Sequence, residues 1–434
     1  MRKMRDSGID WIGTIPQNWQ LSKIGSLYTQ RNEKVSDKEY QPLSVTMQGI
    51  LPQLATAAKT DDGDNRKLVR VGDFAINSRS DRRGSCGISP LDGSVSLINI
   101  ILTPRTAMHP GYYNWLFHTT LFADEFYKWG HGIVADLWTT RWQEMKSITV
   151  PVPEYAEQER IAAFLDAECA EIDAVLEKTR ASIEEYKKLK QAVITQAVTK
   201  GIRGDRPMKD SGIEWIGDIP AEWSVVRQKY FWNTIESGVS VNAADKPVDN
   251  SEQYGVLKTS AVSKFMFIPT EHKQVNLEEY GRVSCPVRAD SIIASRMNTP
   301  ELVGACGYVQ NNYPNLFLPD RLWQITFKDE LSPKYAWYYL SGIRVRQYIS
   351  SLSTGTSSSM QNISQSQYGN IFITIPSIGE QSEIAKYLDE KCNSVDALIV
   401  KKQQYLTEIE NYKKSLIYEY VTGKKEVKTS VLAD

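Results

Sequence analysis

The 434-residue sequence contains no run of eighteen or more apolar residues, so no membrane span is predicted. The first residues, Met1–Asp6, are rich in charge and lack the apolar core of a signal peptide. From these two absences we expect a cytoplasmic protein.

Cysteine and histidine are scarce. The five cysteines are an odd number and form no Cys-x-x-Cys pair, and the four histidines are scattered along the chain. Neither a disulfide framework nor a zinc site is predicted from such a pattern. We therefore expect no metal and no cofactor bound by this chain itself.

The sequence also has a formal net charge of only −1. Its 51 Lys and Arg residues face 52 Asp and Glu residues. Nucleic-acid binders usually carry an excess of cations, so composition alone does not suggest DNA. Hydrophobic residues make up 41% and charged residues 24%, which is typical of a globular protein, and the length predicts two or three domains.

What the sequence does contain is a repeat of itself. Asp6–Pro16 reads DSGIDWIGTIP and Asp210–Pro220 reads DSGIEWIGDIP, an offset of 204, and Trp19 and Trp223 follow at the same spacing. Internal repeats define the organisation of a fold, and near-identity over this length is not chance.

The match continues along both halves of the chain, with an offset that rises from 204 at the opening motifs to 225 at Ile148 and Ile373. The matching segments are Asp73–Arg79 with Asp290–Arg296, Gly84–Gly87 with Gly304–Gly307, Tyr113–Trp115 with Tyr335–Trp337, and Ile148–Pro151 with Ile373–Pro376. Each copy therefore consists of an opening motif, a globular domain and a closing segment.

The globular parts alternate short apolar runs with glycine and asparagine turns, and aromatic-rich helical stretches follow. The predicted strands are Asp73–Ser78, Val95–Leu102, Asp290–Ser295 and Trp323–Phe327, and the predicted helical stretches are Tyr112–Trp129 and Pro333–Ile349. This pattern predicts an α+β fold for both domains.

The closing segments, Glu154–Lys200 and Glu380–Thr422, contain no glycine or proline and are rich in strong helix formers. Steps of three and four residues trace an apolar stripe along each, which predicts a helix that packs against a partner helix. The predicted helix-pair core is Cys169, Ile172, Leu176, Ile183, Tyr186, Val193, Cys392, Val395, Ile399, Leu406, Ile409 and Leu416. Lys190, Lys402 and Lys413 interrupt the stripe, and they either fix the register or extend to water.

The expected chain order is domain (1–150), long helix (151–206), domain (207–376), and long helix with tail (377–434). The first helix ends at the second opening motif, and by the repeat the second helix should end at the first motif. Only an antiparallel helix pair satisfies both. Forty-odd helical residues make a rod of roughly 60 Å, long enough to hold two DNA readers over separate half-sites.

With this organisation the chain resembles the specificity subunit of a type I restriction–modification system over essentially its whole length. The resemblance is carried by the following segments: the paired Trp-Ile-Gly-x-Ile-Pro motifs, Pro151–Leu165 and Pro376–Leu388 with their Glu-Gln pairs, Gly255–Val262, and Leu318–Trp323. Between Arg31 and Arg70 the first domain departs from the usual pattern of the family.

The resemblance implies two target-recognition domains that each read one half of an asymmetric bipartite site, with the helices setting the unread spacer. It further implies a non-catalytic chain. Adenine methylation would come from two methyltransferase subunits that bind S-adenosylmethionine, and cleavage from two restriction subunits that use ATP and Mg²⁺. In agreement, the sequence has no Asn-Pro-Pro-Tyr/Phe motif, no phosphate-binding Gly-x-x-x-x-Gly-Lys-Ser/Thr loop and no ordered nuclease set. No catalytic residue is expected here.

DNA contacts require cationic and polar side chains on loops that reach the grooves and the phosphates. The candidates in the first domain are Lys59, Arg66, Lys67, Arg79, Arg82, Arg83 and Arg141. Those in the second domain are Lys258, Thr259, Ser260, Lys264, Arg296, Asn298, Ser357, Ser358, Ser359, Gln361 and Asn362. The alternative for each is a solvated surface charge or an internal ion pair. Arg79 and Arg296, present in both halves, fit a positioning role as well as base reading.

Two repeated motifs can be explained by a structural role as well as by a functional one. Cys86 and Cys306, each within Gly-x-Cys-Gly, are expected to be small apolar residues in a tight turn and not reactive thiols. The Trp-Ile-Gly-x-Ile-Pro motifs could bind methyltransferase subunits or anchor each domain to a helix end, and packing with some partner contact is favoured.

Two other functions compete with DNA reading. A coiled-coil scaffold that joins two protein-binding domains would fit the repeat and the helices equally well. A free-standing enzyme is disfavoured by the missing catalytic motifs.

Overall fold

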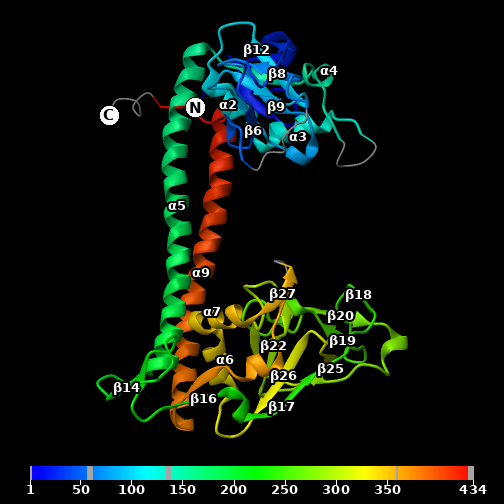
Figure 1. Ribbon diagram of the computed structural model, residues 1–434. Helices are drawn as coiled ribbons and strands as arrows, with labels where there is room; N and C mark the ends of the chain where they lie inside the picture. The colour runs from blue at the N-terminus through cyan, green and yellow to red at the C-terminus, as the bar shows by residue number, and fades with distance from the viewer. Residues whose placement is uncertain (1, 56–61, 133–137, 358–359, 429–434) are drawn as a thin grey trace. The chain divides into compact units, whose positions relative to one another are not determined.

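The computed structural model describes residues 2–55, 62–132, 138–357 and 360–428. The chain divides into two compact units: unit 1 comprises Met1–Arg180 and Gln403–Asp434, and unit 2 comprises Ala181–Lys402. Two long helices are shared between them. Helix α5 (Tyr155–Lys200) starts in unit 1 and ends in unit 2, and helix α9 (Ile378–Val421) starts in unit 2 and ends in unit 1 (Figure 1).

Unit 1 has mixed α and β structure around a four-stranded antiparallel sheet in the order β10-β9-β12-β4. Its strands are β1 (Met4–Asp6), β2 (Thr14–Pro16), β3 (Gln20–Lys23), β4 (Tyr28–Arg31), β5 (Lys34–Val35), β6 (Leu43–Thr46), β7 (Gly49–Pro52), β8 (Arg66–Val69), β9 (Phe74–Asn77), β10 (Cys86–Ile88), β11 (Gly93–Val95), β12 (Asn99–Pro104) and β13 (Thr149–Val152). Its short helices are α1 (Ile24–Leu27), η1 (Ser80–Arg82), α2 (Pro110–Phe117), α3 (Thr120–Lys128) and α4 (Trp142–Met145).

Unit 2 is built around a four-stranded sheet in the order β17-β26-β22-β24. It also contains a five-stranded sheet in the order β18-β20-β19-β25-β21, whose strands lie between β17 and β26 in the sequence. Its strands are β14 (Met208–Asp210), β15 (Asp218–Pro220), β16 (Ser224–Arg227), β17 (Trp232–Ser237), β18 (Ala243–Ala244), β19 (Gly255–Leu257), β20 (His272–Val275), β21 (Pro286–Val287), β22 (Ser291–Ser295), β23 (Met297–Asn298), β24 (Cys306–Val309), β25 (Tyr313–Phe317), β26 (Leu322–Phe327), β27 (Thr354–Ser357), β28 (Met360–Asn362) and β29 (Phe372–Ile375). Its short helices are η3 (Gln228–Phe231), η4 (Thr259–Val262), η5 (Leu277–Glu279), α6 (Pro333–Ser341), α7 (Ile343–Leu352) and α8 (Gln365–Gly369).

The central sheets of the two units have the same topology. Strand β9 pairs antiparallel with β12, with Ile76 opposite Ile100, and strand β22 pairs antiparallel with β26, with Ile292 opposite Ile325. Every residue of both strands is buried, which is why each reads as a continuous apolar run. The α+β fold class and the internal repeat are thus confirmed.

The predicted aromatic helices are each interrupted. Tyr112–Trp129 forms α2 and α3, and Thr119 separates them because its side chain accepts the Phe122 N–H and starts a new helix. In the second stretch α6 ends and α7 begins at Gly342. The predicted strand Val95–Leu102 is likewise divided, since β11 ends at Val95 and β12 begins at Asn99.

Within each unit, α5 and α9 run antiparallel. In unit 1, Phe164 packs against Tyr420 with ring centroids 4.4 Å apart, and Asp173 accepts a hydrogen bond from Lys413 at 2.6 Å. In unit 2, Lys190 donates to Asp396 at 2.6 Å. Rising residue numbers on α5 meet falling numbers on α9, which confirms the direction expected from the repeat.

The residues of the predicted apolar stripes on α5 and α9 are buried or half-buried. The buried members are Cys169, Leu176, Ile183, Cys392, Ile399 and Leu416, and the half-buried members are Ile172, Tyr186, Val193, Val395, Leu406 and Ile409. The lysines that interrupt the stripes bind across the pair: Lys413 and Lys190 form the ion pairs above, and Lys402 lies over the Tyr186 ring. These contacts fix the register, which settles the alternatives left open by the sequence. No helix in the described residues has both the length and the apolarity of a membrane span.

Candidate nucleic-acid interface

Each unit contains a three-residue cluster that we call the Arg–Glu–Trp clamp. In unit 1 the Trp19 indole N–H donates to Glu157 Oε2 at 2.8 Å, and Arg2 Nη1 donates to Glu157 Oε1 at 2.5 Å. The Arg2 guanidinium lies over the Trp19 ring and also donates to the Gly423 carbonyl at 2.9 Å. The clamp therefore joins the opening motif, the start of α5 and the end of α9.

The clamp of unit 2 repeats this geometry. The Trp223 indole N–H donates to Glu380 Oε2 at 2.9 Å, and Arg206 Nη1 donates to Glu380 Oε1 at 2.6 Å. Arg206 lies over the Trp223 ring and donates to the Lys200 carbonyl at 3.0 Å. Here the opening motif is joined to the start of α9 and the end of α5.

The repeated Glu-Gln pairs and tyrosines act as a scaffold in the same way. Gln158 accepts the His109 N–H and Gln381 accepts the Ser332 N–H, which ties each long helix to its globular domain. The Tyr112 hydroxyl donates to the Val421 carbonyl and the Tyr335 hydroxyl to the Val198 carbonyl. Tyr335 therefore corresponds in the structure to Tyr112, which corrects the sequence match with Tyr113 by one residue. In the first opening motif Trp11, Ile12 and Ile15 are buried, which supports the packing explanation of that motif.

In unit 2 the structure brings together candidates that lie far apart in the sequence. The small sheet β23-β28-β27 places Asn298 opposite Gln361 and Met297 opposite Asn362. The Arg296 carbonyl accepts the Ile363 N–H at 3.0 Å, which extends the pairing by one step. The Asn362 side-chain oxygen is buried without a hydrogen-bond partner among the described residues. We call Asn298, Gln361 and Asn362 the amide edge.

The remaining candidates of unit 2 surround η4, which lies against β22. Ser260 donates to Glu271 at 2.6 Å, and Lys258 forms an ion pair with Asp245 at 3.1 Å. The hydrogen bond and charge of Lys258 lower the pKa of Asp245. Lys264 is exposed and Thr259 is half-buried, so these two are the more available for an external ligand.

In unit 1 the corresponding edge carries arginines. Arg79 follows β9 as Arg296 follows β22, and its backbone pairs with Thr139. Arg82 and Arg83 lie on the next turn with 69% and 53% of their side chains exposed, beside Asp81 and Asp124 respectively. Arg79 and Arg141 are also exposed. We call Arg79, Arg82, Arg83 and Arg141 the arginine edge.

Two candidates of unit 1 are not at the surface in the way expected. The structure corrects the expectation that Arg66 is a surface residue available to DNA. Arg66 is only 5% exposed, and its guanidinium donates to the Ser94 hydroxyl at 2.9 Å and to the Ser94 carbonyl at 3.0 Å. Burial lowers its pKa. Lys67 is half-buried and donates to the Asn99 carbonyl at 2.7 Å. Arg66 thus joins β8 to β11 within one sheet, and Lys67 joins β8 to β12 of the central sheet.

Three candidates, Lys59, Ser358 and Ser359, lie outside the described residues, as does the side chain of Ser357. Sequence reasoning also missed Arg2 and Arg206, although the offset of 204 aligns them. Cys86 and Cys306 are buried free thiols, and burial raises the pKa of Cys306 to about 11, which agrees with a packing role. Among the described residues no group of three or more His, Cys, Asp or Glu side chains could hold a metal ion.

Comparison with known proteins finds similarity to one family. Residues 220–410 match the family model of the type I restriction modification DNA specificity domain. The chain is 26% identical to the type I restriction enzyme MjaVIII specificity subunit of Methanocaldococcus jannaschii, over 65% of this chain and 63% of that protein. It therefore spans less than two thirds of that relative. It is 20% identical to the EcoKI specificity subunit of Escherichia coli, over 95% of this chain and 90% of that protein.

Solved structures show the same fold. A chain from a study of complex assembly and conformational transition of the type I R-M system matches with a TM-score of 0.70 and 16% identity, covering 95% of this chain and 99% of that one. The HsdS subunit of Thermoanaerobacter tengcongensis matches with a TM-score of 0.50 and 16% identity, covering 95% and 98%.

Proposed function

Because this chain is similar to type I restriction–modification specificity subunits, we propose that it reads DNA sequence for a complex whose other subunits carry out catalysis. One observation carries the proposal. The two units share a central sheet and an Arg–Glu–Trp clamp, yet they present different side chains at the same edge. A repeated scaffold with unlike edges suits the reading of two unlike half-sites.

The chemistry of the two edges differs in a way that DNA can distinguish. Arginine donates two hydrogen bonds to O6 and N7 of guanine, whereas asparagine and glutamine form paired hydrogen bonds with adenine. The arginine edge of unit 1 thus favours guanine in its half-site, and the amide edge of unit 2 favours adenine. The target is an asymmetric bipartite site.

The long helices set the spacer between the half-sites. Helix α5 is continuous over 46 residues and helix α9 over 44, and both extend into the two units. Ion pairs between the helices hold the register in each unit. A change in helix length should therefore change the preferred spacer and leave the bases read by each unit unchanged.

The chain is non-catalytic in this proposal and acts with partners in the cytoplasm. Two methyltransferase subunits, which bind S-adenosylmethionine, dock on the two equivalent scaffold surfaces and methylate adenine. Two restriction subunits use ATP and Mg²⁺ to translocate and cleave. The near-zero net charge fits this division, because the partners supply part of the phosphate contact.

A binding selection tests the proposal. The assembled methyltransferase complex is incubated with random duplexes, and the bound fraction is sequenced. We expect two different short consensus elements separated by a spacer of fixed length and free sequence. An undivided consensus, or none, would contradict the proposal and favour a protein-binding scaffold.

A further inference from the structure

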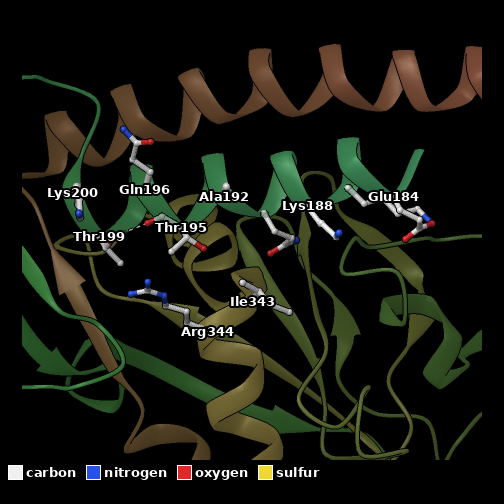
Figure 2. A pocket seen from close by; sticks show the side chains of 11 residues that line it. Glu184, Lys188, Ala192, Thr195, Gln196, Thr199, Lys200, Ile343 and Arg344 are labelled. Atoms are coloured by element: carbon white, nitrogen blue, oxygen red, sulfur yellow. Dashed lines mark hydrogen bonds and ion pairs between the residues drawn. The ribbon is translucent and has the colours of Figure 1, made fainter. Parts of the chain in front are cut away.

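A groove of about 810 Å³ lies within unit 2 between the C-terminal part of α5 and the start of α7. Figure 2 shows side chains of α5, including Lys188 and Thr195, and of α7, Ile343 and Arg344, around the same space. Four cations line it, Lys187, Lys188, Lys200 and Arg344, against one carboxylate, Glu184. We call it the basic groove. The chain as a whole is nearly neutral, so this local excess is a distinct feature.

Two of the four cations are available to a ligand. The Lys200 amine and the Arg344 guanidinium form no hydrogen bond or ion pair with the described residues, and both residues are exposed. Lys187 and Lys188 form ion pairs one turn back along the helix, with Glu184 at 2.7 Å and Glu185 at 2.9 Å. Such exposed pairs are worth only a few tenths of a kcal/mol, so these lysines can turn to a stronger anion.

The start of α7 adds to the positive potential. The helix begins at Ile343 after Gly342, and no side chain caps its first N–H groups. Free N–H groups at a helix start favour anions. The lysines, the arginine and these amides make the groove suited to a polyanion that runs along it.

The described residues of unit 1 do not repeat these cations. The hydrogen bonds from Tyr112 to Val421 and from Tyr335 to Val198 align the two units at an offset of 223. At this offset the four cations correspond to residues without positive charge: Glu410, Asn411, Gly423 and Leu121. A partner that docks equivalently on both units cannot depend on a feature that only one unit has. The ligand is therefore specific to the half of the target that unit 2 reads.

We propose that the basic groove binds the sugar–phosphate backbone of duplex DNA beside the half-site read by unit 2; this inference rests on the proposed function. Helix α7 (Ile343–Leu352) leads from the groove to β27, which pairs with the β28 strand of the amide edge. Its ten residues span about 15 Å, or four to five base-pair steps. The groove thus adds a sequence-independent contact that anchors unit 2 on the duplex.

The test compares two double variants with the same loss of charge. The first is Lys200→Gln with Arg344→Gln, and the control is Lys386→Gln with Lys401→Gln, two exposed lysines of α9 in unit 2 that do not line the groove. Fluorescence anisotropy measures binding of the assembled complex to a labelled duplex carrying the selected site, from ~50 to ~200 mM salt. Circular dichroism and thermal unfolding confirm that each variant is folded.

Each lost phosphate contact lowers the slope of log affinity against log salt by about 0.9. We expect the slope of the first variant to fall by about two. The ratio of wild-type to variant DNA affinity should therefore be roughly tenfold larger at the lower salt concentration than at the higher one. The control should keep the wild-type slope. The bases selected by both variants should be those of the wild type, because phosphate contacts carry no sequence information.

The outcomes separate this inference from the function on which it rests. If the slope is unchanged in a complex that still selects a bipartite site, the groove does not bind the DNA backbone, and the proposed function still stands. An unchanged slope together with loss of the methyltransferase subunit on size-exclusion chromatography shows that the groove binds protein, and also overturns the inference. Absence of any DNA binding by the wild-type complex contradicts both.

Discussion

Matched insertions in the two long helices test how helix length sets the DNA spacer. We consider four alanine-rich residues inserted after Arg180 in α5 and four after Lys402 in α9, where one unit ends and the next begins. Inserting in both helices keeps the ion pairs Asp173–Lys413 and Lys190–Asp396 in register on either side. An insertion in one helix alone would put these pairs out of register.

The helix geometry gives the magnitude. Four residues lengthen a helix by about 6 Å and rotate the part of the helix beyond the insertion by about 40°. A base-pair step advances the duplex by about 3.4 Å and turns it by about 35°. The displacement therefore corresponds to nearly two base pairs and the rotation to about one. We expect the preferred spacer to grow by one to two base pairs.

Three-residue insertions at the same positions provide the control. They lengthen each helix by about 4.5 Å and rotate the part of the helix beyond the insertion by about 300°, which is about 60° less than a full turn. Translation and rotation then no longer correspond to the same spacer. We expect much weaker binding at every spacer length. The assay is a competition among duplexes that share both half-sites and differ only in spacer. Altered half-site bases, or an unchanged spacer optimum with four residues, would refute the reasoning.

Three further predictions concern the scaffold and the arginine edge. Glu380→Gln should lower the free energy of unfolding by about 2 kcal/mol, because it removes the buried carboxylate that Arg206 and Trp223 share and leaves Arg206 paired only with the more exposed Glu222; urea unfolding measures this, and a change below about 1 kcal/mol would contradict the clamp. Arg66→Ala should cost about 2 kcal/mol of stability and leave the selected DNA sequence unchanged, because its contacts are internal. Arg82→Ala with Arg83→Ala should do the reverse, weakening DNA binding with little effect on stability, and the same two assays decide the matter.

Much of the architecture was predictable from local patterns. The apolar runs of β9 and β22 read as strands because both faces of each are buried. The long helices were predictable because neither segment contains glycine or proline. Their direction followed from the repeat, since each helix must end at the opening motif of the other copy.

The parts that sequence reasoning missed depend on contacts between distant residues. No spacing rule connects Arg2 with Glu157 or Arg206 with Glu380, because the partners meet only after folding. Arg66 looked like a surface cation, but the polar partner that allows its burial, Ser94, lies on another strand. The breaks in the aromatic helices at Thr119 and Gly342 depend on capping and packing and not on propensity alone.

The amide edge illustrates the same point for the candidate site. Asn298 and Gln361 were named separately from their polarity, and nothing local showed that they oppose each other across a small sheet. The basic groove also unites α5 with α7, which are separated by most of unit 2 in the sequence. Polarity marks the candidates, while the register of the strands decides which of them act together.

The central claim is that each unit reads its own half-site, and sequencing of the adenines methylated in cells tests it most directly. The wild-type complex should methylate one bipartite, asymmetric sequence. With Asn298→Ala and Gln361→Ala, discrimination in one half-site should fall by about 1–3 kcal/mol per contact, while the other half-site and the spacer stay the same. Loss of specificity in both half-sites at once, or in neither, would contradict the account.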